Sequence, residues 1–560
     1  MIYMKRSIFL SFPFLVILVL TLAGCEKNFD AKIYGTLNPE NYPSTAEEYE
    51  SYSMICYIPF GSTWQYYLGE GYNTHPVYTY EGGGIRMFDM PTDEMFPWTS
   101  KGWDSEWKRN SRADFSQAIY YYRGNSSGDN LNHITKLSHV TRLTEVLGRV
   151  QAADPSVFIA GKKEQLVGEV ALCRAMLMYF IYHVYGPMPL IVNPADVENE
   201  DVQKDIVRPT QEQMCRWIYD DMVLAVDNLP ETVAEKGRYN RDYARFCLMK
   251  HCLNEGADMD GWYDKAEQMY EELTASGRYG LYTDGENPYM KVFSYYNKWN
   301  REIIMAVSNE TNGGTSYEAG NFFPYQKAFM PADISSVDNN GNPTPFTQTG
   351  WAQYYNVAQA FYDQYETGDL RKAAVTTEYW VKPAAGGNPT KKQDPSSIGV
   401  GWDGYLITKW PYETDTANQG HDWPLARWAD VLLMKAELDV RRSGAAPSAE
   451  TVSYVNEVRS RAGLGALPAS ATASADAFLN AVLDERGREF LFEGMRKIDL
   501  IRFNKYAQKT AKVKGFTPTH QYLPLPNFFV EQAKAYGKNI EQEWSRPGWT
   551  EDLAKANSAH

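Results

Sequence analysis

The feature that most constrains the fold of this chain is a helical repeat of apolar residues. From Gln165 to Tyr185, apolar side chains recur in steps of three and four residues. This spacing predicts a long helix with one buried face. We expect the helix to end at Gly186-Pro187, because glycine permits a left-handed cap and proline cannot continue a helix.

Similar patterns recur along the chain and predict further helices at Gln211 to Asn228, Tyr243 to Asn254, Trp262 to Ala275, Arg427 to Arg442, Ala449 to Arg461, Ala475 to Phe492 and Arg496 to Lys509. Helix pairs of this length, joined by short turns, are typical of tetratricopeptide-like units, in which each pair buries its apolar face against the next. The sequence therefore predicts a mostly α fold.

Two long irregular tracts interrupt the helices. Tyr52 to Arg123 is rich in aromatic residues, and the run Gly82-Gly83-Gly84 predicts that its rings lie on loops. Tyr279 to Gly401 is rich in Gly, Pro, Asn and aromatic residues, with an expected strand at Glu302 to Val307 and an expected helix at Ala352 to Tyr365. So long a tract indicates a functional surface, with disorder as the alternative.

The N-terminus has the features of an export signal. Ile8 to Leu22 is mostly apolar but too short to span a bilayer as a helix. It leads into Leu22-Ala23-Gly24-Cys25, which resembles the bacterial lipobox, whose cysteine is acylated before cleavage. We expect removal of residues 1–24, lipidation of Cys25 and a lipidated tether over residues 25–40. The alternative is a plain secretory signal with an accidental cysteine.

Charge and cysteine spacing argue against several classes of function. The formal charge of −15 at pH 7, with no basic cluster, argues against nucleic-acid binding. The cysteines and histidines show no metal-binding spacing, so no metal or cofactor is predicted. Cys173, Cys215, Cys247 and Cys252 fall in predicted helices and are expected to be buried. Asp338-Asn339-Asn340-Gly341-Asn342 favours a turn over a calcium loop.

Several segments, in order, resemble the SusD/RagB family of outer-membrane nutrient-binding lipoproteins. They are Arg174-Ala175 with Tyr185-Gly186-Pro187-Met188-Pro189-Leu190, Asp422 to Glu437, Val455 to Leu464, Asp484 to Phe490, Phe492 to Phe503 and Tyr522-Leu523-Pro524-Leu525-Pro526. Two departures are Asp430, where the family usually has Glu, and Ser545-Arg546-Pro547-Gly548-Trp549 near the end.

The resemblance implies a SusD-like α-α superhelix with long irregular aromatic-rich loops and few short strands. An N-terminal region, 41–278, and a C-terminal region, 279–560, would pack as one compact body. It also implies a non-catalytic, outward-facing lipoprotein that binds an oligosaccharide, or in some members a peptide, and delivers it to a SusC-like TonB-dependent transporter. The alternatives are a secreted helical glycosidase and a tetratricopeptide scaffold that binds peptides or proteins.

In this family the ligand surface is built by loops outside the helix pairs, which here are Tyr52 to Arg123 and Tyr279 to Gly350. A sugar needs flat apolar surfaces beside planar polar groups, so we predict ligand contacts from the residues of these loops that offer such chemistry. They are Trp64, Tyr66, Arg86, Asp93, Trp98, Trp103, Tyr317, Asn321, Phe322 and Tyr325.

The family-like motifs themselves are rich in charge of both signs at helical spacing. These residues are Arg459, Arg461, Glu485, Arg488, Glu489, Glu493, Arg496 and Asp499. The pattern predicts a buried or partly buried ion network between neighbouring helices, with a structural role.

Overall fold

The computed structural model describes residues 42–61, 66–67, 73–74, 76–78, 83–97, 109–115, 133–309, 329–346, 355–383, 386–392, 405–413 and 420–558, with the backbone alone for 66–67 and 73–74. The predicted signal peptide, Cys25 and the predicted tether lie outside these residues.

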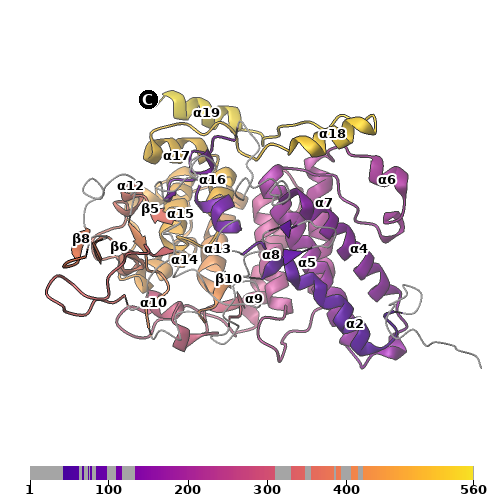
Figure 1. Ribbon diagram of the computed structural model, residues 1–560, viewed down its shortest axis with the longest axis horizontal. Helices are drawn as coiled ribbons and strands as arrows, with labels where there is room; N and C mark the ends of the chain where they lie inside the picture. The colour runs from indigo at the N-terminus through magenta and orange to yellow at the C-terminus, as the bar shows by residue number, and fades with distance from the viewer. Residues whose placement is uncertain are drawn as a thin grey trace, which may run out of the picture.

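Long helices pack in chain order through the first half of the molecule (Figure 1). They are α2 (Ala46–Ser53), α4 (Lys136–Ala152), α5 (Lys162–Tyr185), α7 (Gln211–Asn228), α8 (Arg241–Glu255) and α9 (Trp262–Ala275). The later helices α13 (Trp428–Ser443), α14 (Ala449–Arg461) and α15 (Ala475–Glu489) continue the stack, since α13 packs against both α8 and α9. The predicted mostly α fold is confirmed, and α7, α9 and α14 have the predicted bounds.

Helix α5 shows why the periodicity was informative. An 18-residue window of this helix is apolar enough to cross a membrane, but 89% of that window is buried by neighbouring helices, so α5 is a core helix. It ends at Gly186, as predicted, with φ at +77°. A Cβ at this glycine would collide with the ring of Trp544, so the glycine is required by packing as well as by conformation.

The last helices are α16 (Arg496–Arg502), α17 (Tyr506–Lys514), α18 (Asn527–Ala535) and α19 (Trp549–Ser558). The single helix predicted from Arg496 to Lys509 is wrong, because Asn504 has a left-handed φ of +53° and separates α16 from α17. The helix predicted to reach Phe492 ends at Glu489, and Phe492 also has a positive φ, +64°.

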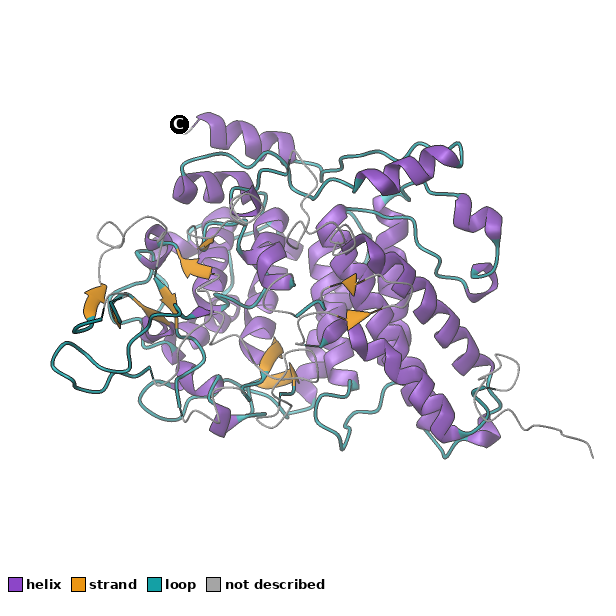
Figure 2. Cartoon of the chain, in the orientation of Figure 1, coloured by secondary structure: helices purple, strands orange, loops and turns teal. Residues whose placement is uncertain are grey.

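Within the described ranges the strands are short and form two-stranded antiparallel pairs (Figure 2). The pairs are β1 (Tyr66–Tyr67) with β2 (Asn73–Thr74), β3 (Met95–Pro97) with β5 (Tyr355–Val357), β4 (Ile303–Val307) with β10 (Trp423–Arg427), β6 (Val375–Thr376) with β9 (Leu406–Ile407), and β7 (Tyr379–Val381) with β8 (Thr390–Lys392). The predicted strand at Glu302 to Val307 is β4, and the prediction of few short strands is confirmed.

Short helices and helical turns complete the chain. They are α6 (Glu200–Lys204), α10 (Pro288–Val292), α12 (Gln359–Tyr362), η1 (Met54–Phe60), η2 (Ile85–Asp89), η4 (His133–Thr135), η5 (Pro155–Val157), η6 (Pro194–Asp196), η7 (Tyr295–Asn297), η8 (Leu370–Ala374) and η11 (Ala469–Thr472). The helical turns η1 and η2 correct the prediction that Tyr52 to Arg123 is loop throughout.

The predicted helix at Ala352 to Tyr365 is also wrong, because its first half pairs as strand β5 and only α12 is helical. Val357 exchanges backbone hydrogen bonds with Tyr405, with N···O distances of 2.8 and 2.9 Å. This tertiary pairing overrides the local helical pattern.

The irregular tract between the helix pairs, Tyr279 to Gly401, contributes to a second hydrophobic core. This core combines aliphatic side chains with aromatic rings, most of the rings from that tract, and Trp423 and Phe492 are added from later segments. Trp410 stacks on Trp423 with ring centroids 4.8 Å apart, and Phe329 contacts Phe492 at 5.3 Å. The described parts of the tract are therefore packed, and the alternative of disorder is wrong for them.

Candidate functional site

Charged side chains form a network in the interior between the C-terminal helices and the second core. Arg427, which is 1% exposed, forms ion pairs with Glu302, Glu489 and Glu493, with N···O distances of 2.6, 3.0 and 2.6 Å. Arg461 adds pairs with Glu302 and Glu489. The buried ion network predicted from the charge pattern is confirmed at these positions.

A neighbouring part of the network centres on Glu485. Its carboxylate lies 2.7 Å from Arg371, 2.7 Å from Arg488 and 3.2 Å from Arg459. Burial by itself would raise the pKa of Glu485, but the surrounding arginine charges hold it at about 2. The carboxylate therefore stays charged at neutral pH, and its role is to hold the surrounding arginines in place.

Two residues predicted to contact ligand, Arg86 and Asp93, lie in the interior and are 0% exposed. Both oxygens of Asp93 accept hydrogen bonds from Arg496, at 2.9 and 2.8 Å. Arg86 belongs to η2, whose residues are all buried. Ligand contact from a surface loop does not fit this placement, because neither side chain reaches solvent.

Of the other eight predicted ligand contacts, the structure describes only one, and that one by its backbone alone. Tyr66 belongs to β1, where its backbone pairs with Thr74. Seven residues lie outside the described part of the chain, namely Trp64, Trp98, Trp103, Tyr317, Asn321, Phe322 and Tyr325. These eight positions stay predictions.

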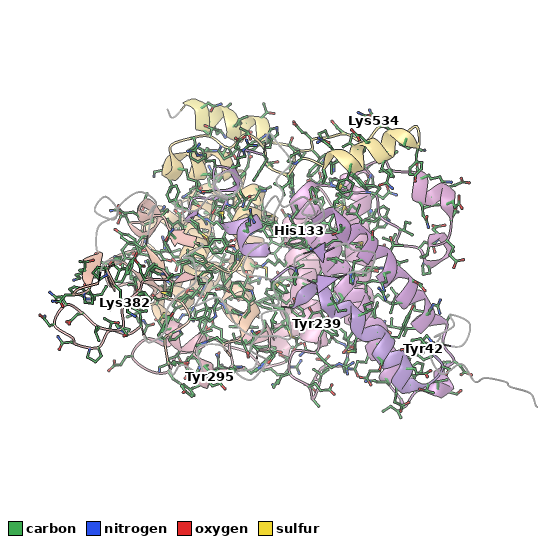
Figure 3. The ribbon with its side chains drawn as sticks, viewed as in Figure 1. Tyr42, His133, Tyr239, Tyr295, Lys382 and Lys534 are labelled. Carbon is green, nitrogen blue, oxygen red and sulfur yellow. The ribbon has the colours of Figure 1, made fainter. Side chains whose placement is uncertain are left out.

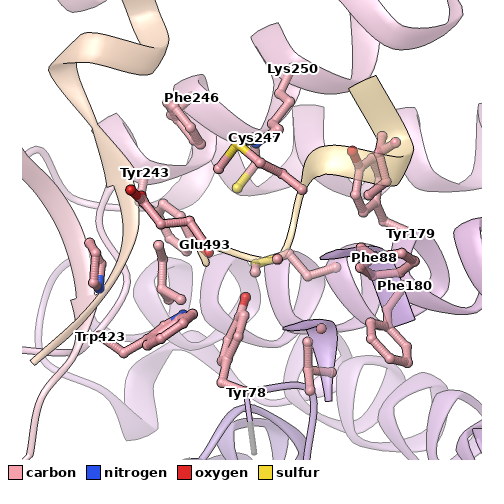
Figure 4. A pocket seen from close by; sticks show the side chains of 18 of the residues that line it. Tyr78, Phe88, Tyr179, Phe180, Tyr243, Phe246, Cys247, Lys250, Trp423 and Glu493 are labelled. Atoms are coloured by element: carbon pink, nitrogen blue, oxygen red, sulfur yellow. Dashed lines mark hydrogen bonds between the residues drawn. The ribbon is translucent and has the colours of Figure 1, made fainter. Parts of the chain in front are cut away.

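An apolar cavity lies between α5, α8 and the segment before β3 (Figure 4). Its volume is about 120 Å³, and its lining includes Tyr78, Phe88, Tyr179, Phe180, Tyr243, Phe246 and Trp423. Sites for small-molecule ligands typically measure about 300–1,000 Å³. The cavity is therefore too small to hold an oligosaccharide.

A larger groove, of about 510 Å³, opens where the helix pairs meet the second core. Its lining comes from η1, from residues 236–239 in the turn before α8, from Ala306 to Ser308 at the end of β4, and from Leu425 of β10. In the view of Figure 3, Tyr239 marks this junction near the middle of the molecule.

The groove brings the two irregular tracts together. Gly61 lines it and lies three residues before Trp64 in the chain. Ser308 lines it from the other tract, nine residues before Tyr317. The convergence of these tracts was expected from the sequence, whereas this pairing of η1 with β4 was not.

Aromatic and cationic groups shape the groove wall. The Tyr57 and Tyr239 rings meet edge to face at 4.8 Å, and the Tyr239 backbone N–H donates to the Tyr57 hydroxyl at 3.0 Å. Ile58 is 42% exposed beside them. Arg238 is held by Glu50 and Glu169, at 2.5 and 2.7 Å.

Sequence reasoning missed these wall residues for identifiable reasons. Tyr57 lies inside the aromatic tract, but it gave no local signal that separated it from the other rings. Lys236 to Tyr239 belong to the turn after Leu229-Pro230, which looked like a simple connection between helices. Only the folded chain places this turn against β4.

A family model described as the SusD family matches residues 301–524. Over these residues the chain is similar to the SusD family, as its motifs predicted. A SusD-like protein, P38, from Formosa agariphila is 25% identical over 380 residues, covering 64% of this chain and 71% of that protein. The starch-binding protein SusD of Bacteroides thetaiotaomicron is 32% identical over 147 residues, covering 25% of this chain and 24% of that protein.

Solved structures share the SusD fold. A SusD superfamily protein from Parabacteroides distasonis aligns with a TM-score of 0.66 at 19% identity, covering 89% of this chain and 99% of that one. Surface glycan-binding protein A from Bacteroides thetaiotaomicron, in complex with laminarihexaose, aligns with a TM-score of 0.65 at 19% identity, covering 88% of this chain and 99% of that one.

The region that matches the SusD family model contains the ion network but only part of the groove. Residues 301–524 include β4, β10 and the helices α13 to α17. The groove residues from η1 and from the turn before α8 precede this region. The part of the chain that the family model matches is therefore mainly the helical scaffold with its ion network.

Proposed function

We propose that this protein is a surface-exposed outer-membrane lipoprotein that binds an oligosaccharide or polysaccharide nutrient and delivers it to a SusC-like TonB-dependent transporter. The observation that carries the proposal is the aromatic groove at which the two irregular tracts of a SusD-like chain meet. The laminarihexaose complex of a protein with the same fold supports a glycan as the ligand.

The chemistry of the groove suits a sugar. The Tyr57 ring and the apolar side chain of Ile58 provide surface for the C–H face of a pyranose. Ser308 and Lys236 supply polar groups for its hydroxyl edge. Binding of this kind needs no covalent step, and we propose that the protein is not an enzyme.

Glycan binding is tested by replacing Tyr57 in the groove. Tyr57→Ala should weaken binding to a retained polysaccharide by about threefold to tenfold, because one aromatic contact is lost. Isothermal titration or affinity electrophoresis measures the change. Tyr536→Ala is the matched control, since Tyr536 is a 42% exposed tyrosine just after α18. Equal loss in both variants, or none in either, contradicts the assignment.

The predicted aromatic contacts outside the described residues are tested in the same assay. Trp98→Ala and Trp103→Ala should each weaken glycan binding with little loss of thermal stability, if their rings lie on loops as the sequence predicts. Unchanged isotherms for both would remove that segment from the site.

The alternatives give different outcomes. Incubation with polysaccharides should produce binding without new reducing ends, whereas steady chain shortening would indicate a glycosidase. Failure to bind any glycan, together with capture of peptides, would favour a protein-binding scaffold. Co-purification with a TonB-dependent transporter from detergent-solubilised membranes tests the partner.

A further inference from the structure

Lys236 is an exposed cation on the wall of the groove. Its Nζ lies 5.0 Å from the centroid of the Trp299 ring. Within the described part of the chain this ammonium group forms no ion pair. The cation–π contact orients the lysine without neutralising its charge.

The backbone under Trp299 supports the idea that this pair is held in place. Trp299 has a φ of +53°, a conformation that costs energy for a bulky residue and that persists only when its surroundings impose it. Its ring is partly buried and packs against both hydrophobic cores. Trp299 is therefore a fixed platform for the lysine above it.

The charges that face the groove favour an anion. Two cations, Lys236 and Arg238, line it, and its described lining includes no carboxylate. Arg238 is already paired with Glu50, Glu169 and Glu235, which leaves Lys236 as the charge available to a ligand. A second large groove, between α9 and α13, differs in carrying four carboxylates, Asp260, Asp264, Asp439 and Glu450, which outnumber its three cations, Lys435, Arg441 and Arg442.

We infer that the groove binds an acidic saccharide, with the carboxylate of a uronic acid unit placed against Lys236 and its sugar ring against Tyr57. This inference rests on the proposed function and names the substrate class of the same site. The whole chain has a formal charge of −15, so an acidic polymer is repelled by most of the surface. Because of this repulsion, an acidic saccharide needs a local cation to bind its carboxylate, and an aromatic ring beside that cation can hold the sugar.

The test compares pectin of low and high methyl esterification in affinity gels, with alginate as a second acidic glycan and laminarin and xylan as neutral ones. Esterification removes the carboxylate charge and leaves the backbone of the polymer intact. We expect retention of the acidic glycans over the neutral ones. Equal or stronger retention by neutral glycans overturns the inference but leaves the proposed function standing, and no retention by any glycan overturns both.

Variants of Lys236 test whether this residue is responsible for the retention of acidic glycans. Lys236→Met keeps the aliphatic stem and should lower affinity for the retained acidic glycan about fivefold, as expected for loss of one exposed ion pair. Lys236→Arg keeps both charge and ring contact and should restore binding. Lys534→Met removes an exposed cation on α18 and is the control. Unchanged binding by Lys236→Met, or an equal loss with Lys534→Met, contradicts the placement.

Discussion

At the residue scale, Arg496 joins parts of the chain that are far apart in sequence. It holds Asp93 through two hydrogen bonds, and its backbone N–H donates to Asp89 at 3.0 Å. Arg496→Ala should lower the free energy of unfolding by about 3–5 kcal/mol, because it leaves the Asp93 carboxylate buried and unpaired. Thermal melting measures the loss, and titration should show glycan affinity nearly unchanged.

A double variant provides the control for that prediction. Asp93→Leu with Arg496→Met removes both charges and should be more stable than Arg496→Ala alone, because the buried Asp93 carboxylate is no longer left without a partner. Reduced glycan affinity with an unchanged melting temperature in Arg496→Ala would contradict the structural role.

Lys497 makes the stability of the folded protein depend on pH. It is 2% exposed among the rings of Phe115, Tyr506 and Tyr522, and burial lowers its pKa from 10.5 to about 7. Between these values the unfolded chain binds the proton and the folded chain does not, so this group makes stability rise with pH from about 7 to 10.5.

Replacing this lysine tests the sign of the effect. Lys497→Met should be more stable than the parent protein at pH 6, and the difference should shrink as the pH rises toward 10. Denaturant unfolding at several pH values measures it. A difference that is constant with pH, or that grows as pH rises, would show that Lys497 does not titrate in this way.

Residue-level prediction succeeded where partners are close in sequence and failed where they are not. The alternation of charge from Arg459 to Asp499 predicted the ion network, and pairs such as Arg461 with Glu489 join neighbouring helices. Asp93 and Arg86 looked like loop residues, since their burial depends on segments about 400 positions away, such as Arg496 for Asp93. A local pattern carries no information about such a partner.

At the element scale, the break between α16 and α17 depends on one residue. Asn504 takes a left-handed φ of +53°, which asparagine tolerates and β-branched residues do not. Asn504→Val should therefore lower the free energy of unfolding by about 1–3 kcal/mol, whereas Asn504→Gly should be close to neutral. Chemical denaturation of the two variants makes the comparison, and equal stability would show that this conformation is not the reason for the break.

Elements with strong periodicity were predictable, and elements made by tertiary pairing were not. The helices α7, α9 and α14 follow their apolar spacing. Side-chain caps begin two of them, Thr210 for α7 and Ser448 for α14. Strand β5 exists because Tyr355 to Val357 meet β3, a segment about 260 residues earlier. The second core was missed for the same reason, since its aromatic rings are scattered along the tract.

At the scale of the whole molecule, the proposed anchor precedes the folded body. Tyr42, where the described chain begins, lies at one end of the molecule (Figure 3). The 17 residue steps from Cys25 to Tyr42 span at most about 60 Å when fully extended. Such a tether would let the groove stand clear of the membrane.

Loss of the acylated thiol tests this anchor. Cys25→Ser should abolish incorporation of a labelled fatty acid and move the protein from the membrane fraction to the soluble fraction, with its melting temperature unchanged. Cys56→Ser, at a buried cysteine, is the control for general effects of cysteine replacement and should keep the label. Continued labelling of Cys25→Ser would contradict the lipobox.

The clasp of Asp89 and Asp93 by residues 494–496 also sets an order of events during biogenesis. These carboxylates emerge early from the ribosome, while their partners follow about 400 residues later. A chain interrupted before Gly494 cannot close the second core around η2. Truncated products would therefore stay open to proteases, because these contacts form only when synthesis has run nearly to completion.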